Sequence, residues 1–138
     1  MADFSLKIVT SQGLIFDGMA EKLIVRTTAG DMAVLARHIN CVCALGMGRA
    51  VIVTEGERRT AACIGGVLEV LNGAVRLVPT TFEWAEDIDV ARAEASLENA
   101  KQILAQSEAE KDSVRIAKAK AKINRALVRQ SVAGELKR

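Results

Sequence analysis

The first part of the chain alternates apolar and polar residues over short runs, which is the period of a β-strand with one buried face. In the first run, Phe4, Leu6 and Ile8 alternate with Ser5 and Lys7. Short strands separated by glycine or polar residues predict an all-β sandwich or barrel. Further runs of this kind are KLIVRTT, MAVLA, AVIVTEG, RTAACIG and GVLEVL.

Several positions in this β region specify turns or edges. Asn72-Gly73 separates two apolar runs, and both residue types accept the positive φ angles of a tight hairpin turn. The run VIVTEGERRTAAC is a weaker hairpin signal, and we interpret Gly65-Gly66 as a turn. Pro79 lies in the last strand-like run, which predicts that this run is an edge strand or ends there.

From about Ile88 the apolar residues recur every three or four positions, which is the period of an α-helix. The polar segment SEAEKDS interrupts this pattern, so we expect two helices joined by a short link in an antiparallel hairpin. The β region and the hairpin predict two domains, residues 1–85 and 86–138. The two helical seams consist of Val90, Ala93, Leu97, Ala100 and Leu104, and of Ile116, Ala119, Ile123, Ala126 and Gln130.

The predicted helix seams are rich in alanine, which lets two helices approach closely but buries little area. At roughly 0.8 kcal/mol per buried CH₂, each alanine in place of a leucine contributes a few kcal/mol less to the stability of the helix pair. The hairpin is either an ordinary alanine-rich helix pair or a weakly held pair that is able to open.

One face of the second predicted helix is basic. No acidic residue occurs between Ser113 and Ser131, and like charges at helical spacing repel one another. The face is either solvated or meets an acidic surface or an anion. Its residues, which we call the basic stripe, are Arg115, Lys118, Lys122, Arg125 and Arg129.

The geometry of a hairpin predicts that arginines of both helices converge. If the link turns near residue 110, Arg92 faces the region between Arg125 and Arg129. Asp89 lies in the same layer, and either Asp89 or Asp87 is suited to cap the first helix. Because a guanidinium group binds phosphate oxygens through parallel hydrogen bonds, this end of the hairpin is a candidate phosphate site.

Composition narrows the classes of function. The chain has 138 residues, a net charge of +2 and 3% aromatic residues. Its core must therefore consist of aliphatic side chains, and its charge does not by itself indicate nucleic acid. Three cysteines without a signal-like N-terminus predict reduced thiols in the cytosol. The longest apolar run, CVCALGM, is too short to span a membrane, so we expect membrane contact only through a partner.

The sequence carries no motif for independent catalysis. It lacks the glycine-rich phosphate loop GxxxxGK[ST], and His38 has no nearby serine–acid pair. Cys41 and Cys43 share one face of a strand, and with His38 and Cys63 they would form a Cys₃His zinc site if all four converged. We favour small buried core thiols and expect no metal.

Four segments, in order and at matching spacing, resemble the epsilon subunit of F-type rotary ATP synthases. They are FSLKIVTSQGLIFDG, TTAGDMAVLARHIN, IGGVLEVLNGAVRLV and AEDIDVARA, and the resemblance covers nearly the whole chain. It implies a β-sandwich of about ten strands followed by an antiparallel α-helical hairpin. It also implies a non-catalytic central-stalk subunit that requires no cofactor. Such a subunit is peripheral to the cytoplasmic face of the cell membrane, in a proton- or sodium-transporting synthase.

By this resemblance the sandwich packs on the gamma subunit and touches the membrane c-ring, with Asp31 and His38 as contact residues. The hairpin is implied to be regulatory. When it extends, its basic stripe reaches an acidic segment of the catalytic beta subunits and inhibits ATP hydrolysis.

In some bacterial members of the family the folded hairpin binds ATP through the motif I/L-D-x-x-R-A. Residues 88–93, IDVARA, match this motif in full. The resemblance therefore implies ATP as a regulatory ligand. The implied ATP-binding residues are Glu83, Ile88, Asp89, Arg92, Ala93, Arg125 and Arg129.

Two other functions fit parts of the sequence. A free-standing ATP sensor would use the same arginines, whereas a nucleic-acid-binding hairpin would use the basic stripe and would bind duplexes with a steep salt dependence. Acidic residues on the first predicted helix and the lack of aromatic residues among the basic ones argue against nucleic acid. We therefore expect no nucleic-acid partner.

Overall fold

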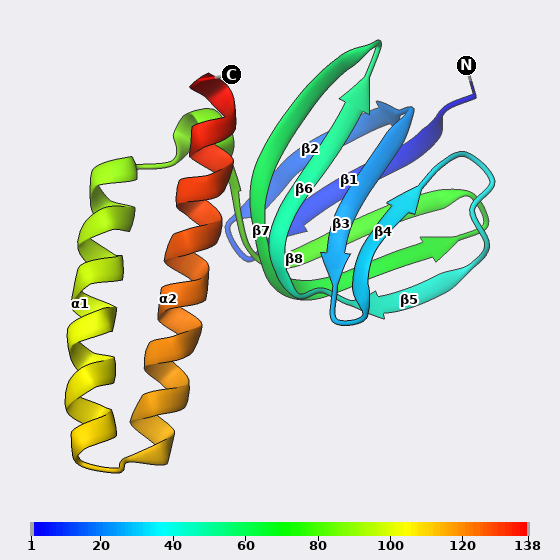
Figure 1. Cartoon of the computed structure of the whole chain (residues 1–138). Coiled ribbons are helices and arrows are strands. Elements are labelled where there is room, and N and C mark those ends of the chain that lie inside the picture. The colour runs from blue at the N-terminus through cyan, green and yellow to red at the C-terminus, as the bar shows by residue number, and fades with distance from the viewer. Residues whose placement is uncertain (1, 138) are drawn as a thin grey trace. The chain divides into compact units, whose positions relative to one another are not determined.

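The computed structural model describes residues 2–137 and divides the chain into two compact units, one ending at Trp84 and one beginning at Ala85 (Figure 1). The predicted order of a β-sandwich followed by a helical hairpin is confirmed. In the described residues the first unit contains the strands β1 (Phe4–Thr10), β2 (Gly13–Ala20), β3 (Lys22–Thr27), β4 (Gly30–Val34), β5 (Cys41–Ala44), β6 (Met47–Thr54), β7 (Glu57–Leu71) and β8 (Ala74–Trp84). The second unit contains the helices η1 (Ala85–Asp87), α1 (Val90–Ala109), α2 (Ser113–Gly134) and η2 (Glu135–Lys137).

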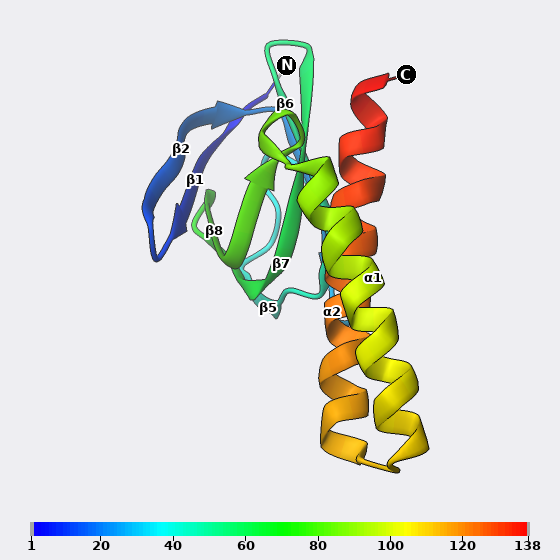
Figure 2. The same cartoon turned by 90° about the vertical axis from the view of Figure 1, so that its left-hand side faces the viewer.

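The strands form one mixed sheet that folds over on itself into a sandwich (Figures 1 and 2). Its order is β2-β1-β8-β7-β6-β3-β4, with β5 paired to β7. Neighbouring strands are antiparallel except β1 and β8, which are parallel. Strand β7 belongs to both layers, because residues 57–64 pair with β6 and residues 67–70 pair with β5.

Gly65 and Gly66 form the bend in β7 between these two pairings. Their φ angles are 69° and 100°, a region that disfavours residues with a Cβ. At Gly66 a Cβ would lie 2.1 Å from the carbonyl oxygen of Val78. The expected turn at these glycines is therefore wrong: RTAACIG and GVLEVL are one bent strand. This is one reason why the described residues contain eight strands and not about ten.

Gly66→Ala is expected to lower the free energy of unfolding by about 2–5 kcal/mol, because the added methyl group combines an unfavourable φ angle with a clash against β8. Gly56→Ala is the matched control, since Gly56 has a φ of 79° but open space around a Cβ. Urea unfolding measures both variants. Gly56→Ala should cost roughly 1–2 kcal/mol of unfolding free energy. If Gly66→Ala cost no more than that, the close crossing of β7 and β8 would be contradicted.

The core of the sandwich is mostly aliphatic, as the low aromatic content predicts, and the alternation places it on one face of β1. Phe4, Leu6 and Ile8 of β1 are buried, whereas Ser5 and Lys7 are exposed. One face of each strand therefore supplies the core. Other core residues include Leu23, Val25, Val34, Ile52, Leu68 and Leu77.

Both predicted hairpin turns are present. Asn72 and Gly73 have φ angles of 49° and 83°, and Glu55 and Gly56 have φ angles of 51° and 79°. Two consecutive positive φ angles are the signature of the tight turn that matches the twist of antiparallel strands. The turns set the registers of β7 with β8 and of β6 with β7.

Pro79 lies inside β8, which continues to Trp84. Strand β1 pairs with β8 only as far as Leu77. Beyond Leu77 one side of β8 has no neighbouring strand among the described residues, so a residue without an N–H is tolerated. Of the two predictions for Pro79, an edge position is therefore the one the structure supports.

Helices α1 and α2 form an antiparallel hairpin (Figure 2), and the seam between them is rich in alanine. Ala93, Leu97 and Ala100 of α1 are buried, as are Ala119 and Ala126 of α2. The predicted seams are confirmed at these five positions. No described helix has the length and hydrophobicity needed to cross a membrane.

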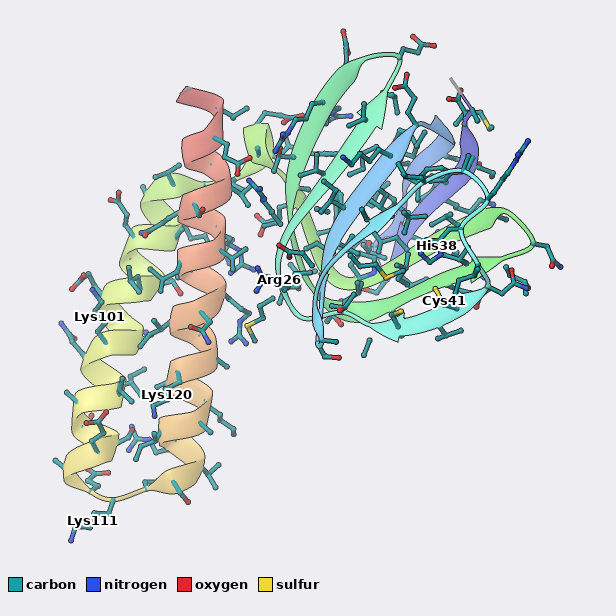
Figure 3. The ribbon with its side chains drawn as sticks, turned by 45° about the vertical axis from the view of Figure 1, so that its right-hand side comes forward. Arg26, His38, Cys41, Lys101, Lys111 and Lys120 are labelled. Atoms are coloured by element: carbon teal, nitrogen blue, oxygen red, sulfur yellow. The ribbon has the colours of Figure 1, made fainter. Side chains whose placement is uncertain are left out.

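The link between the helices comprises only residues 110–112, with Lys111 at the tip (Figure 3). It is shorter than the predicted segment SEAEKDS, because α1 includes Ser107. The Ser107 side chain is buried, and its Oγ donates a hydrogen bond to the carbonyl oxygen of Ile103 at 2.6 Å. Asp112 caps α2 by accepting a hydrogen bond from the backbone N–H of Arg115 at 3.2 Å.

Candidate functional site

Residues 88–93 span the N-cap and the first turn of α1. The Asp89 carboxylate accepts a hydrogen bond from the backbone N–H of Arg92, with Oδ1 3.0 Å from the nitrogen. Asp89, and not Asp87, is therefore the cap of the first helix. Ile88 and Ala93 are buried, whereas Asp89 and Arg92 are exposed. The apolar residues of the motif hold the helix start, and its polar residues face solvent.

The start of α1 and the end of α2 lie at the same open end of the hairpin (Figures 1 and 2). Arg92 is exposed and Arg125 is half-buried. Neither side chain makes a hydrogen bond or ion pair with any residue that the structure describes. Arg129 is also half-buried and interacts with another residue. Two guanidinium groups at this end are thus free to bind an anion.

Glu83, the remaining residue of the predicted ATP site, lies on β8. It is half-buried and pairs with Ala62 of β7. Glu83 belongs to the first unit, whereas the other predicted ATP-binding residues belong to the second.

The basic stripe runs along α2 beside the seam. Arg115, at its start, forms an ion pair with Glu110 in which Nη1 and Oε2 are 3.1 Å apart. Lys118, Lys122 and Arg125 have no carboxylate partner within residues 2–136. The middle of the stripe therefore presents three uncompensated positive charges, which suit an acidic or phosphate-bearing partner.

Asp31 and His38, the predicted subunit contacts, lie on β4 and in the loop that follows it. Asp31 faces Arg26 of β3 across a tight hairpin, and the distance from Nε to Oδ1 is 2.6 Å. The hydrogen bond from Arg26 lowers the pKa of Asp31, so the carboxylate is ionised at neutral pH. His38 lies near β5, with its Nδ1 2.9 Å from the carbonyl oxygen of Ile39 (Figure 3).

The three cysteines fall into two environments. Cys63 is buried in the core, and burial raises the pKa of its thiol to about 12. Cys41 and Cys43 are half-buried on β5. In the part of the chain that the structure describes, no three His, Cys, Asp or Glu side chains gather around a common point where they could hold a metal ion. The Cys₃His arrangement with His38 therefore does not form.

Exposed apolar side chains cross the outer face of β5, β7 and β8. Val67 of β7 faces Ala44 on one side and Val78 on the other. Val42, also on this face of β5, is 72% exposed. We call these four residues the valine row. Contiguous exposed apolar surface is typical of a site of contact with a partner.

Comparison with known proteins gives the same family for both units. The model for the beta-sandwich domain of the ATP synthase delta/epsilon chain matches residues 3–85, and the model for its long alpha-helix domain matches residues 86–134. The ATP synthase epsilon chain of Ruminococcus albus is 34% identical over 136 residues, which cover 98% of this chain and 99% of the relative. That of Shouchella clausii is 32% identical over 133 residues, 96% of each chain.

A solved structure of the mitochondrial ATP synthase of Euglena gracilis contains a chain of the same fold. Its TM-score is 0.81 at 22% identity, covering 99% of this chain and 82% of that one. The two matched models follow each other in the order of the sandwich and the hairpin, and the relatives align over nearly the full length. This chain belongs to the ATP synthase delta/epsilon chain family.

Proposed function

We propose that this chain is the epsilon subunit of an ATP synthase central stalk. Its sandwich anchors it to the gamma subunit and the membrane ring, and its hairpin regulates ATP hydrolysis by the catalytic beta subunits. The observation that carries this proposal is that relatives named ATP synthase epsilon chain align over nearly the whole of both units. The subunit is non-catalytic, and in this role it lies peripherally at the cytoplasmic face of the membrane.

The valine row supports the role of the sandwich as the anchor. Burying exposed apolar side chains in a partner is favourable at about 25 cal/mol per Å², and an apolar patch of this kind suits a lasting contact with the gamma subunit. Asp31, held by Arg26, supplies an oriented carboxylate for polar loops of the ring. As the family resemblance implies, His38 is proposed to contact the gamma subunit.

Val67→Glu in the full-length chain is expected to weaken binding to the purified gamma subunit by about 10- to 100-fold, because the contact would bury an unpaired carboxylate. Calorimetry measures the affinity. Val114→Glu is the matched control, since Val114 is 62% exposed but lies on α2. Equal affinity of the two variants, both folded by circular dichroism, would contradict the valine row as the anchoring surface.

Two features of the hairpin support a regulatory role. Its seam buries mostly alanine, so at roughly 0.8 kcal/mol per CH₂ it is stabilised less than a leucine seam of the same length. Lys118, Lys122 and Arg125 lack carboxylate partners among the described residues. A hairpin that opens would offer these charges to an acidic segment of the beta subunits, and inhibition would follow from that contact.

ATP is proposed as a regulatory ligand of the folded hairpin. Arg92 and Arg125 would bind its phosphate oxygens, and the cap made by Asp89 holds the helix start that presents Arg92. A ligand that contacts both helices stabilises the closed hairpin in proportion to the logarithm of its concentration. The same free arginines also fit a free-standing ATP sensor. Binding of this chain to the gamma subunit would argue against that alternative.

A further inference from the structure

Residues 32–43 place three sulfur atoms and an imidazole at one edge of the sandwich. They belong to Met32 on β4, His38 in the loop that follows, and Cys41 and Cys43 on β5. The role proposed above for the sandwich uses none of the sulfur atoms. Figure 3 shows His38 beside Cys41, and the distance between its Nδ1 and the cysteine Sγ is 4.0 Å.

The fold brings the three sulfur atoms together from two layers. Strand β4 ends the path of the sheet, and β5 branches from β7 at the other layer. Cys41 and Cys43 face the interior, because their partners in β7 are the core residues Val70 and Leu68. Met32 and both cysteines are half-buried, so solvent reaches this edge.

The spacing of the sulfur atoms suits a single soft ion. Three sulfur ligands at about 2.3 Å from one metal ion stand about 4 Å from each other. The distance from Met32 Sδ to Cys43 Sγ is 3.8 Å. Cys41 and Cys43 are two residues apart on β5 and share the face that packs on the core, so the third sulfur lies on the same face as the second. Thiolate and thioether ligands favour soft metal ions, and Cu(I) is one of them.

We propose that Met32, Cys41 and Cys43 form a three-coordinate Cu(I) site at the edge of the sandwich. On binding, the two thiols release their protons to solvent, and the ion with two thiolates carries a charge of −1. His38 lies beside this group, with its Nδ1 2.9 Å from the Ile39 carbonyl oxygen and 4.0 Å from the Cys41 sulfur. Zn²⁺ prefers four ligands, whereas the residues that the structure describes bring three sulfur atoms to this edge.

The test is a competition for Cu(I) between the full-length reduced protein and bicinchoninate, a coloured chelator of Cu(I), without oxygen. The wild-type chain should remove one equivalent of Cu(I) from the chelator. Loss of a residue that supports a metal ligand typically lowers metal affinity by roughly 10- to 100-fold. Cys41→Ala and Cys43→Ala each remove a ligand itself, so each should lower the affinity for Cu(I) by at least that much. Met32→Leu should have a smaller effect, since a thioether carries no charge.

Matched controls separate this site from general thiol binding. Cys63→Ala removes the buried core thiol, and Met19→Leu removes an exposed methionine on β2. Both should keep the wild-type affinity, and thermal melting followed by circular dichroism verifies that each variant is folded. If a variant does not fold, the wild-type chain is titrated with Ag(I) instead, and its backbone amide signals are followed by NMR. The signals of residues 32–43 should shift, whereas the signal of Cys63 should not.

Three results would overturn the proposal. The first is that the wild-type chain removes no Cu(I) from the chelator. The second is that Cys63→Ala loses as much affinity as Cys43→Ala. The third is that a parallel titration shows tighter binding of Zn²⁺ than of Cu(I).

Discussion

Replacing Arg92 with alanine in the full-length chain is expected to weaken ATP binding by about 10- to 100-fold, which matches the loss of hydrogen bonds to a charged group. The helix cap should survive, because Asp89 binds the backbone N–H of Arg92 and not its side chain. The guanidinium makes no hydrogen bond or ion pair with a described residue. Its removal should therefore leave the free energy of unfolding nearly unchanged. Calorimetry with millimolar ATP measures the affinity.

Arg115→Ala is the control for the proposed ATP site. Arg115 lies on the same hairpin but at the opposite end, where it is paired with Glu110. It should keep the wild-type affinity for ATP, whereas Arg125→Ala should behave like Arg92→Ala. An absence of binding heat with the wild-type chain, or an equal loss in Arg115→Ala, would remove the ATP site from the proposed function.

Reversing two charges of the basic stripe, with Lys118→Glu and Lys122→Glu combined, is expected to raise the concentration of chain needed for half-inhibition of ATP hydrolysis by about 100-fold or more. The reason is that like charges facing each other across a contact cost several kcal/mol, and each 1.4 kcal/mol is about a tenfold change. Inhibition by the wild-type chain should also weaken as salt screens the contact. A reconstituted catalytic head with the gamma subunit supplies the assay.

Lys111→Glu combined with Lys120→Glu is the control for the stripe. It makes the same change in net charge, but Lys111 lies in the link and Lys120 lies outside the stripe on α2 (Figure 3). This variant should inhibit nearly as well as the wild-type chain. If both double variants lost inhibition equally, total charge and not the stripe would be responsible.

The sequence predicted those parts of the fold that depend on local pattern. Asn72-Gly73 formed the expected turn because both residue types accept positive φ angles. The bend at Gly66 was misread because a glycine pair marks a turn equally well, and only the crossing of β8 reveals the close approach of backbones. The polar pattern places Ser107 in the link, but Ser107 lies within α1, where its hydroxyl donates a hydrogen bond to a carbonyl of the same helix.

The candidate sites depend more than the fold does on contacts between strands, and a single sequence does not reveal those contacts. The family motif pointed to Asp89 and Arg92, and local rules explain the cap between them. Arg26 could not be predicted as the partner of Asp31, because their contact requires the register of β3 with β4. The contact between Met32 and Cys43 likewise requires the two layers to meet.

Hydrolysis of ATP by the purified catalytic head with the gamma subunit tests the division of labour between anchor and regulator. The rate is measured without this chain, with the full-length chain, and with a chain that ends at Ala85. The full-length chain should lower the rate, while the shortened chain should bind the gamma subunit and leave the rate unchanged. Equal inhibition by both chains, or no inhibition by the full-length chain, would contradict the proposed regulatory role of the hairpin.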